Sequence, residues 1–408
     1  MESKVRLVLK RNEEKRLRGG HLWIFSNEVD TQRSPMAEFS AGQVVDVFDH
    51  DGKALGSALV NPHSLICARL ISRKAGVKPT PGWFKKRLKR ALELRESRDD
   101  NNGHPHHNGR CYRMVYSESD GLPGLIIDRY DTVLVGQLNT AGMDALRPVI
   151  EKALVDLLDP AAILWRNDSQ IRELEGLERE VISGPGTLPD SVELLENDLK
   201  FTLALDQGQK TGWYFDQRAN RERVAPLLAQ CENVLDLYSY QGAWGIAAAK
   251  AGAKKVLCVD SSESAVDAIP GHAKANGVDA HVSAVKANAE RYMDSLLEEK
   301  ARFDAIIVDP PAFAPRAKDV GQALKAYRRL NEKALRLLNP GGLLVSMTCS
   351  AHIHEERYES LLLQAARHID RDIQVLMRLE QGPDHPVHPA IPESRYLKGR
   401  VVRVLPSF

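Results

Sequence analysis

The chain has 408 residues, more than one hydrophobic core usually supports, so we expect two or three domains. Its 43% hydrophobic and 27% charged residues are typical of a globular protein, and no apolar run reaches the length of a membrane helix. The N-terminus is charged and lacks the apolar core of a secretory signal, so we expect a cytoplasmic protein with no membrane partner.

The charge is unevenly distributed although the net charge is only +1. Residues 73–98 hold ten Lys or Arg against two Glu, and residues 1–23 hold seven against three. Such local basic clusters favour contact with a polyanion such as nucleic acid. The alternative, a solvated helix face, is the more common meaning of an isolated charge run.

The first part of the chain has the pattern of a small β-rich module. Short β-like runs separated by Gly and Asp turns lie at Val5–Leu9, Val44–Phe48, Ala54–Val60 and Ile66–Ile71. Helical spacing of apolar residues follows over 79–98. Residues 99–109 form a polar segment with three histidines, His104, His106 and His107, which we interpret as a solvent-exposed loop and not as a metal site.

The middle part, residues 112–182, has the pattern of a compact α+β region. A turn at 119–124 is followed by a strand at Thr132–Leu138 and a helix near Met143–Leu158. The composition then changes near residue 190. We therefore predict three domains: a β-rich domain over 1–74, a central α+β domain over 75–190, and a third domain over 191–408.

The third domain alternates strands with helices, which predicts a mostly parallel sheet flanked by helices, an α/β fold. The predicted strands are Val234–Tyr238, Val256–Asp260, His281–Val285, Ala305–Asp309 and Leu343–Thr348. Two late strands, Ile373–Leu379 and Gly399–Leu405, are joined by a Pro-rich loop and have the pattern of a terminal antiparallel pair.

The segment Val234–Gly245 passes from a strand through a loop into a helix, a typical ligand site of α/β proteins. Gly242 and Gly245 permit close approach of the backbone, and Asp260 closes the next strand, where an acid fits ribose hydroxyls. The dinucleotide pattern G-x-G-x-x-G is absent, and an acid at Asp236 suits the cationic, phosphate-free S-adenosylmethionine better than a diphosphate. A structural role for either Asp as a helix cap stays open.

A second site follows the fourth strand, where Asp309-Pro310-Pro311-Ala312-Phe313 ends the ladder. The fifth strand ends at Cys349. If the two strands are neighbours, Asp309 and Cys349 lie close together, because paired strands are about 5 Å apart. A lone cysteine is more often a small buried hydrophobe, and we keep that interpretation for Cys258. The other cysteines are Cys67, Cys111 and Cys231. The sequence has no C-x-x-C pair and therefore gives no indication of a zinc site.

Together these groups fit methylation of cytosine at carbon 5. That carbon becomes nucleophilic only after a thiolate has added to carbon 6. A carboxyl group at ring nitrogen 3 stabilises the charge that develops there. The sequence identifies no base for removal of the carbon 5 proton.

Several long motifs resemble the three-domain ribosomal RNA 5-methylcytosine methyltransferases of the large subunit, over almost the whole chain. His21–Ser26 and Gly42–Asp46 look like the N-terminal PUA RNA-binding domain of that family, and Glu118–Gly124 with Ile127–Arg129 looks like its central domain. Lys210–Arg218 is similar to the entry into its catalytic domain, and the C-terminal loop matches at Asp384–Val387 and Tyr396–Gly399.

The resemblance implies a class I, Rossmann-like methyltransferase domain that uses S-adenosylmethionine and acts on large-subunit ribosomal RNA. It implies Cys349 as the nucleophile and Asp309 as its partner on the base. The predicted cofactor-binding residues are Phe215, Gln217, Asp236, Tyr238, Ser239, Gly242, Gly245, Asp260, Asn288 and Asp309. Asn288 stands where relatives often have an acid for the adenine amino group. The predicted substrate-binding residues are Pro310, Pro311, Phe313, Arg218 and Arg328, although either arginine equally fits a surface charge.

Two other functions stay open. An Asp-Pro-Pro segment followed by an aromatic residue, here Phe313, also suits methylation of an exocyclic amine, which needs no thiol. The basic clusters alone would suffice for a non-catalytic RNA-binding assembly factor, with Trp23 or Phe25 stacking on bases. His385 fits a position over the active site or a structural role in its loop. The oligomeric state is open, with a homodimer as one option.

Overall fold

The computed structural model describes residues 6–96, 110–205, 211–314 and 316–406. The chain forms two compact units. The first comprises Met1–Leu194, Leu203–Trp213 and Pro383–Ser394, and the second comprises Leu195–Thr202, Tyr214–Gly382 and Arg395–Phe408. The division into three domains at residues 74 and 190 stays a prediction. The loop 99–109 and its three histidines lie outside the described residues.

The N-terminal part of the first unit is a five-stranded sheet in the order β1-β3-β4-β5-β2. Its strands are β1 (Arg6–Val8), β2 (Trp23–Ile24), β3 (Val44–Phe48), β4 (Ala54–Val60) and β5 (Ala68–Ser72), with the short helix α1 (Glu14–Arg18). The predictions for β3 and β4 are confirmed to the residue. Alternating apolar residues such as Val45, Val47 and Ala58 form the core of this sheet.

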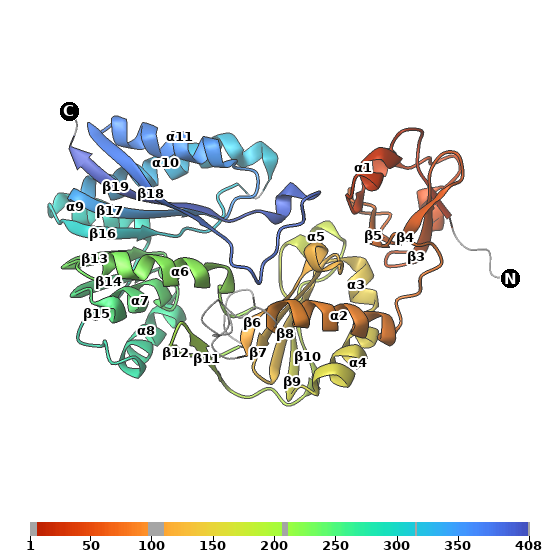
Figure 1. Cartoon of the computed structure of the whole chain (residues 1–408), viewed down its shortest axis with the longest axis horizontal. Coiled ribbons are helices and arrows are strands. Elements are labelled where there is room, and N and C mark those ends of the chain that lie inside the picture. Colours follow the sequence, from red (N-terminus) through yellow and green to blue (C-terminus); the bar gives the residue numbers. More distant parts are fainter. Residues whose placement is uncertain (1–5, 97–109, 206–210, 315, 407–408) are drawn as a thin grey trace. The chain divides into compact units, whose positions relative to one another are not determined.

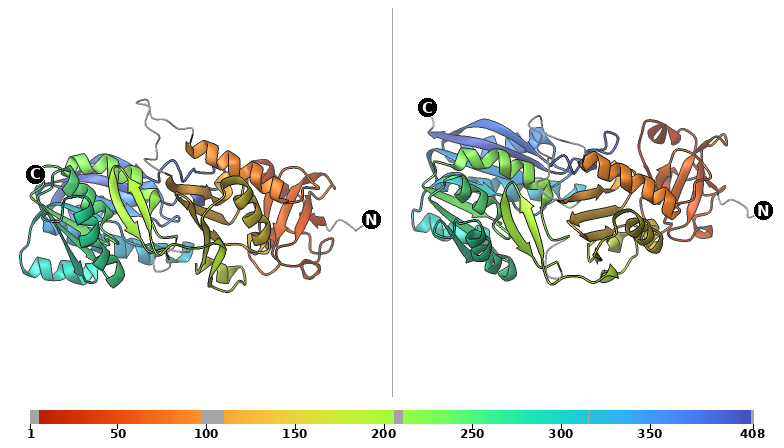
Figure 2. Two further views of the ribbon diagram at one scale, coloured as in Figure 1. Left: turned by 90° about the horizontal axis from the view of Figure 1, so that it is seen from below. Right: turned by 60° about the horizontal axis from the view of Figure 1, so that its bottom comes forward.

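A second five-stranded sheet in the same unit has the order β10-β9-β8-β7-β6. It is built from β6 (Cys111–Tyr116), β7 (Leu125–Tyr130), β8 (Val133–Leu138), β9 (Ala162–Asn167) and β10 (Glu180–Gly186). Helix α2 (Pro81–Glu96) packs on it through Phe84 and Leu88, beside α4 (Arg147–Leu158), as Figure 2 shows. Short helices α3 (Ala141–Ala145) and α5 (Ile171–Leu174) complete it.

The single helix predicted over Met143–Leu158 was wrong, because the structure has two helices that meet at Leu146. Pro148 lies in the first turn of α4, where its missing N–H costs nothing. In an uninterrupted helix the same proline would remove an internal hydrogen bond. The interruption between α3 and α4 therefore follows from Pro148.

The second unit contains a seven-stranded sheet in the order β15-β14-β13-β16-β17-β19-β18. Its strands are β13 (Asn233–Leu237), β14 (Lys255–Asp260), β15 (Val282–Lys286), β16 (Phe303–Val308), β17 (Leu338–Thr348), β18 (Arg371–Glu380) and β19 (Lys398–Pro406). The first five are parallel, and β19 runs antiparallel between β17 and β18. The chain order reverses at β13, the usual position of a ligand in such sheets. A two-stranded ribbon of β11 (Val192–Glu196) and β12 (Leu199–Leu203) precedes the sheet.

Helices cover both faces of the seven-stranded sheet (Figure 1). They are α6 (Arg218–Val224), α7 (Ala243–Ala251), α8 (Glu263–Ala275), α9 (Ala289–Glu298), α10 (Val320–Leu337) and α11 (Glu355–Arg367). One core joins α9, α10 and α11 to the sheet through residues such as Met293, Leu330 and Leu362. The predicted α/β fold is confirmed. Within the described ranges, no helix has the length and apolarity to cross a membrane.

Candidate active site

The loop between β13 and α7 has an unusual backbone. Tyr238 and Tyr240 have φ angles of 59° and 48°, in the left-handed region that non-glycine residues rarely adopt, and Gly242 has φ 81°. The end of β14 holds the loop, because Asp260 accepts a hydrogen bond from the Tyr240 N–H at 2.9 Å. Strained backbone of this kind persists where the surroundings enforce it, and it is frequent at ligand sites.

Asp236 lies fully buried at the end of β13. Its Oδ2 accepts a hydrogen bond from the Gly245 N–H at 2.9 Å, whereas its Oδ1 has no partner among the described residues. Burial raises the pKa of Asp236 to about 8, the Gly245 N–H lowers it, and the negative charges of Asp309 and Asp260 raise it further. The carboxyl group therefore lies beside the loop, with one polar atom unused.

Gly245, in the first turn of α7, permits close packing of this helix against β14. A Cβ at this position would lie 2.4 Å from the Cys258 Sγ, so only glycine lets α7 lie this close to β14. Its contact with a cofactor stays a prediction. Cys258 is fully buried, and burial raises its pKa well above the ordinary value, in agreement with the structural role expected for it.

Two further buried polar atoms near the loop have no partner among the described residues, the Ser239 Oγ and the Gln241 Oε1. Asp260 is partly exposed and uses its two oxygens to accept the N–H groups of Tyr240 and Ser262. Buried polar atoms without partners are uncommon and indicate an absent binding partner. The loop therefore fits a polar ligand such as an adenosine-containing cofactor.

Two predicted cofactor residues have other contacts in the structure. The Asn288 side chain caps α9 by accepting the Arg291 N–H at 3.1 Å. Phe215 is fully buried, and the Arg218 guanidinium lies 5.0 Å from its ring centroid. Their contact with a cofactor stays a prediction.

Asp309 follows β16, and its carboxyl group accepts hydrogen bonds from two side chains. The Gln217 Nε2 donates to its Oδ2 at 2.9 Å, and the Trp244 Nε1 donates to the same atom at 3.2 Å. Burial raises the pKa of Asp309 to about 6, the negative charge of Asp216 adds to this, and the Trp244 and Gln217 donors oppose it. A substantial fraction of this carboxyl group is therefore protonated just below neutral pH.

Cys349 follows β17, the parallel neighbour of β16, with Val308 paired to Ser346. Its Sγ lies 3.7 Å from the carbonyl oxygen of Pro310. The expectation that the two strand ends lie together is confirmed. Cys349 is partly exposed, whereas Cys67, Cys111, Cys231 and Cys258 are buried.

The segment after Asp309 is fixed by side chains that the sequence did not single out. The Tyr327 hydroxyl, on α10, donates to the Pro311 carbonyl at 3.4 Å and lies 3.1 Å from the Ser350 Oγ. The Phe313 ring lies 4.6 Å from the Tyr327 ring, and Ser350 accepts the Ala314 N–H. Pro310 is buried and Pro311 is exposed. Tyr327 could have been noticed only as an aromatic residue on the apolar face of α10.

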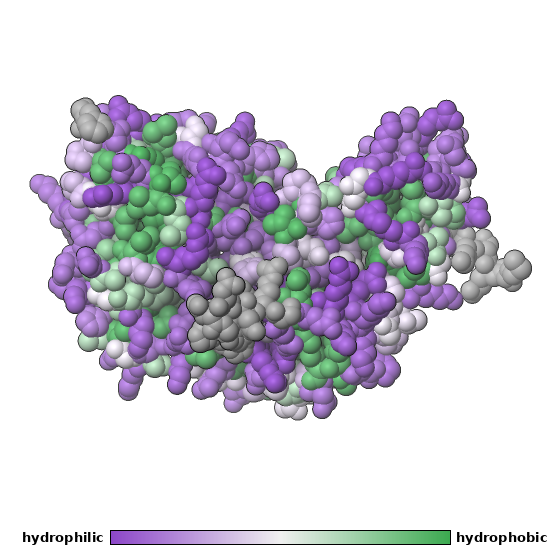
Figure 3. Space-filling view, viewed as in Figure 1, coloured by the Kyte–Doolittle hydropathy of each residue, from purple (hydrophilic) through white to green (hydrophobic). Residues whose placement is uncertain are grey.

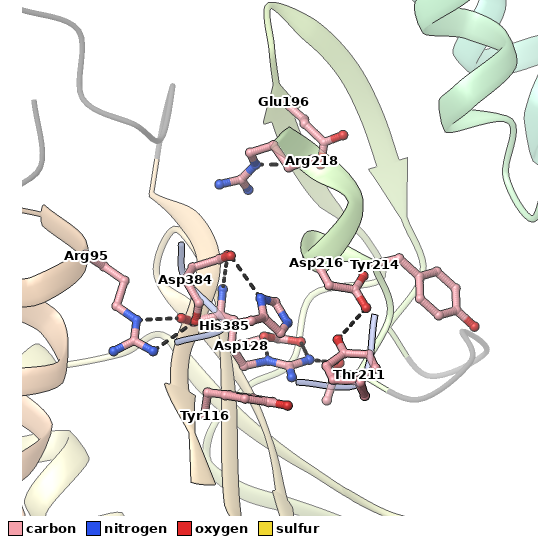
Figure 4. Close-up of polar contacts among 12 residues, drawn as sticks. Arg95, Tyr116, Asp128, Glu196, Thr211, Tyr214, Asp216, Arg218, Asp384 and His385 are labelled. Atoms are coloured by element: carbon pink, nitrogen blue, oxygen red, sulfur yellow. Dashed lines mark hydrogen bonds and ion pairs between the residues drawn. The ribbon is translucent and has the colours of Figure 1, made fainter. Parts of the chain in front are cut away.

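The two predicted substrate arginines differ. Arg218 is buried, with its Nε 3.7 Å from Glu196 (Figure 4), so the surface-charge alternative is wrong for it. Arg328, next to Tyr327 on α10, is partly exposed and makes no ion pair within the described ranges. Contact of either arginine with RNA stays a prediction.

The first unit has a basic groove of about 590 Å³, lined in part by α2. Its cations are Arg73, Lys86, Arg87 and Arg90, and Figure 3 shows the hydrophilic surface over α2. The Arg87 guanidinium lies 3.6 Å from the Trp83 ring centroid and donates to the Ile71 carbonyl, so its position is fixed. We call this feature the α2 groove.

His385 also lies in the first unit, in the segment Pro383–Ser394. It is 2% exposed and bonds the Asp384 carboxylate at 2.9 Å, while the Asp384 carbonyl accepts from Arg95 (Figure 4). Of the two roles open for His385, these contacts favour the structural one. In the described parts of the chain, no group of three or more His, Cys, Asp or Glu side chains could hold a metal ion.

Comparisons with known proteins agree with the fold. Residues 7–73 match a PUA-like domain, and residues 168–398 match the S-adenosylmethionine-dependent methyltransferases. Proteins named ribosomal RNA large subunit methyltransferase I are 35% identical over 408 residues in Vibrio cholerae and over 402 residues in Shewanella denitrificans, each covering 98% of this chain and 99% of the relative.

Two solved structures share the fold along almost the whole chain. A methyltransferase complexed with SAH has a TM-score of 0.82 at 23% identity, covering 98% of this chain and 100% of that one. An S-adenosylmethionine-dependent methyltransferase from Streptococcus mutans has a TM-score of 0.81 at 22% identity with the same coverage.

Proposed function

The chain belongs to the S-adenosylmethionine-dependent methyltransferases, in the family of proteins named ribosomal RNA large subunit methyltransferase I, and we propose that it methylates carbon 5 of a cytosine in large-subunit ribosomal RNA. The observation that supports this proposal most strongly is the partly exposed Cys349 thiol beside the Asp309-Pro310 segment, in a chain whose other four cysteines are buried.

The cofactor binds at the loop between β13 and α7. Asp260 holds the ribose hydroxyls, and the unpartnered Ser239 Oγ and Asp236 Oδ1 accept or donate hydrogen bonds to the polar groups of the ligand. When bound there, S-adenosylmethionine supplies an electrophilic methyl group on a positively charged sulfur. The left-handed backbone at Tyr238 and Tyr240 gives this loop its conformation.

The thiolate of Cys349 forms a bond to carbon 6 of the cytosine, and the ring electrons move toward carbon 5, which becomes nucleophilic. Asp309, whose pKa is raised to about 6, donates a proton or hydrogen bond to ring nitrogen 3, where negative charge develops. After methylation the carbon 5 proton passes to water, and the electron pair of the broken carbon–hydrogen bond re-forms the double bond between carbons 5 and 6. The bond between carbon 6 and sulfur then breaks, and its electron pair returns to the Cys349 thiolate.

Methylation of an exocyclic amine is less well supported. That chemistry uses the carbonyls of the Asp-Pro-Pro segment to hold the amine. Here the Pro310 carbonyl faces the Cys349 Sγ, and the Pro311 carbonyl accepts from the Tyr327 hydroxyl. These contacts favour a role for the thiol.

Binding of ribosomal RNA is supported by the first unit. The α2 groove presents four cations, Arg73, Lys86, Arg87 and Arg90, against the acids Glu93, Glu118 and Asp120, of which Asp120 is paired with Arg95. The net field is positive and suits phosphates. Phosphate contacts in this groove would add affinity for RNA but would not select a particular nucleobase.

The test is methylation of large-subunit ribosomal RNA with labelled cofactor by Cys349→Ala, with Cys231→Ala as the matched control because Cys231 is a buried cysteine of the same unit. We expect 5-methylcytosine from the wild type and from the control, and none from Cys349→Ala. Nucleoside analysis separates ring from amine methylation. Calorimetry with S-adenosylmethionine excludes the non-catalytic alternative if the wild type binds. Formation of 5-methylcytosine by Cys349→Ala overturns the mechanism.

A further inference from the structure

A lysine is buried at the start of β19, next to the strand that ends at Cys349. Lys398 is only 5% exposed, and it pairs in register with Thr348, the residue before Cys349. Its Nζ donates to the carbonyl oxygens of Ser350 and Tyr396, each at 3.2 Å. Two backbone carbonyls therefore fix the ammonium beside the chain segment that bears the thiol.

This ammonium makes no ion pair among the residues that the structure describes, although buried lysines are usually paired. Glu355, at the start of α11, raises the pKa of Lys398 from a distance, but its carboxylate pairs with Arg400. A buried charge without a partner is costly, so its retention needs a reason. The sequence offered only the motif Tyr396-Leu397-Lys398-Gly399, with no role for the lysine.

Charged and titratable groups around the thiol come from several elements. Tyr214 precedes α6, and Tyr327 lies on α10. Burial raises the pKa of both tyrosines, so both are neutral near pH 7. Around Lys398 the groups are Glu355, the exposed Arg395 and Cys349 itself. Asp309 follows the neighbouring strand β16, and its negative charge would oppose ionisation of the thiol. Lys398 is a buried cation whose charge acts on Cys349 in the opposite sense.

Building on the proposed role of Cys349, we propose that Lys398 is a positioning residue that stabilises the Cys349 thiolate by its positive charge. The thiol loses its proton to water, the electron pair stays on sulfur, and Lys398 keeps its own proton. Burial lowers the pKa of Lys398 to about 8, and Glu355 and Cys349 oppose this, so the ammonium persists at neutral pH. A neighbouring cation is a general means of raising the thiolate fraction of a cysteine.

The test is the pH dependence of Cys349 alkylation by iodoacetamide, followed by mass spectrometry of the peptide that contains it. Because thiolates and not thiols react, the midpoint of the profile reports the ionisation of the thiol. In Lys398→Met we expect the midpoint to rise by about one pH unit, which means about tenfold slower alkylation near neutral pH. Lys398→Arg keeps the charge, so its midpoint should stay near that of the wild type.

Arg395→Met is the matched control, since it removes an exposed cation that solvent screens, and its midpoint should move little. An unchanged midpoint in Lys398→Met, or equal shifts in the Met and Arg variants, overturns the proposal. If Lys398→Met does not fold by thermal melting, Lys398→Gln replaces it, and an unchanged midpoint in that neutral variant equally overturns the proposal.

The alkylation assay contains no RNA and no cofactor, so its outcome is independent of methylation. A shift in Lys398→Met together with an active Cys349→Ala would support the ion pair and refute the covalent route. An inactive Cys349→Ala with no shift would support the covalent route and refute the role of Lys398.

Discussion

The loop after β13 and the segment after β16 follow adjacent parallel strands and lie at one edge of the same sheet, but they satisfy their polar groups differently. The first has strained backbone at Tyr238 and Tyr240 and leaves the Ser239 hydroxyl without a partner among the described residues. In the second, Tyr327 and Ser350 bind the segment from Pro311 to Ala314. The first region has the properties of a site completed by a ligand, and the second those of a site organised in advance.

This difference matters because the proposed function assigns different tasks to the two regions. A cofactor that is exchanged in every cycle can complete hydrogen bonds that the empty site lacks. A covalent step instead needs its groups held before the substrate arrives, since catalysis depends on preorganised charges and dipoles. Substitutions in the two regions should therefore have opposite signatures.

The largest effect is expected in the preorganised region. Asp309→Asn keeps the contact with Gln217 but loses the carboxyl proton that nitrogen 3 requires. We expect the methylation rate to fall by about 10²- to 10³-fold. The affinity for S-adenosylmethionine should change little if Asp309 acts on the base, whereas a loss of affinity would support its other predicted role in cofactor binding. Single-turnover methylation and calorimetry measure the two quantities. Asp319→Asn, at an exposed ion pair with Arg316, is the control, and a large loss of cofactor affinity in Asp309→Asn would argue against the comparison.

A smaller effect separates stability from binding. Tyr327→Phe removes a hydroxyl that bonds Pro311 and Ser350, so we expect a loss of about 1 kcal/mol in the free energy of unfolding and an unchanged cofactor affinity. Ser239→Ala removes a buried hydroxyl that has no partner within the described ranges, so stability should not fall, whereas cofactor affinity should fall about fivefold. Denaturant unfolding measures the stability of both variants, and calorimetry measures their affinity for S-adenosylmethionine. If both variants lost the same one of these two quantities, the two regions would not differ as proposed.

A further expected effect is a pH-dependent change in stability at Asp236. Because its pKa is raised in the folded state from 3.8 to about 8, the protonated carboxyl group favours folding. That contribution is fully present below pH 3.8 and is lost as the pH rises through 8. Asp236→Asn cannot ionise, so its melting temperature should exceed that of the wild type by a few degrees, roughly, at pH 8.5 and by less at pH 5. An equal difference at both pH values would contradict the raised pKa.

The sequence predicted what local pattern determines. Strands β3 and β4 were identified to the residue, whereas the sequence stated the closeness of Asp309 and Cys349 only on the condition that β16 and β17 are neighbours, which the structure shows. Strand β17 begins earlier than expected, at Leu338, because Leu338 pairs with Phe303 before an irregularity in the ladder that ends at Leu343. The predicted terminal antiparallel pair exists, but the insertion of β19 between β17 and β18 depends on long-range pairing that no local pattern encodes.

The same limit applies to the site. Asp309 and Cys349 could be predicted because each directly follows a strand. Tyr327 and Lys398 act on groups 16 to 48 residues away, through contacts fixed only by the packing of α10 and β19. No local pattern marked Lys398, because a lysine at the start of a strand is usually exposed.

The central claim is a covalent bond between Cys349 and a cytosine, and RNA that contains 5-fluorocytidine tests it most directly. Fluorine replaces the carbon 5 proton and cannot be removed by a base, so the adduct persists after methyl transfer. With S-adenosylmethionine, the wild type and Cys231→Ala should form an RNA–protein complex stable to denaturation, with the RNA attached to the peptide that contains Cys349. The absence of this complex from an active wild-type protein, or its formation by Cys349→Ala, would contradict the account.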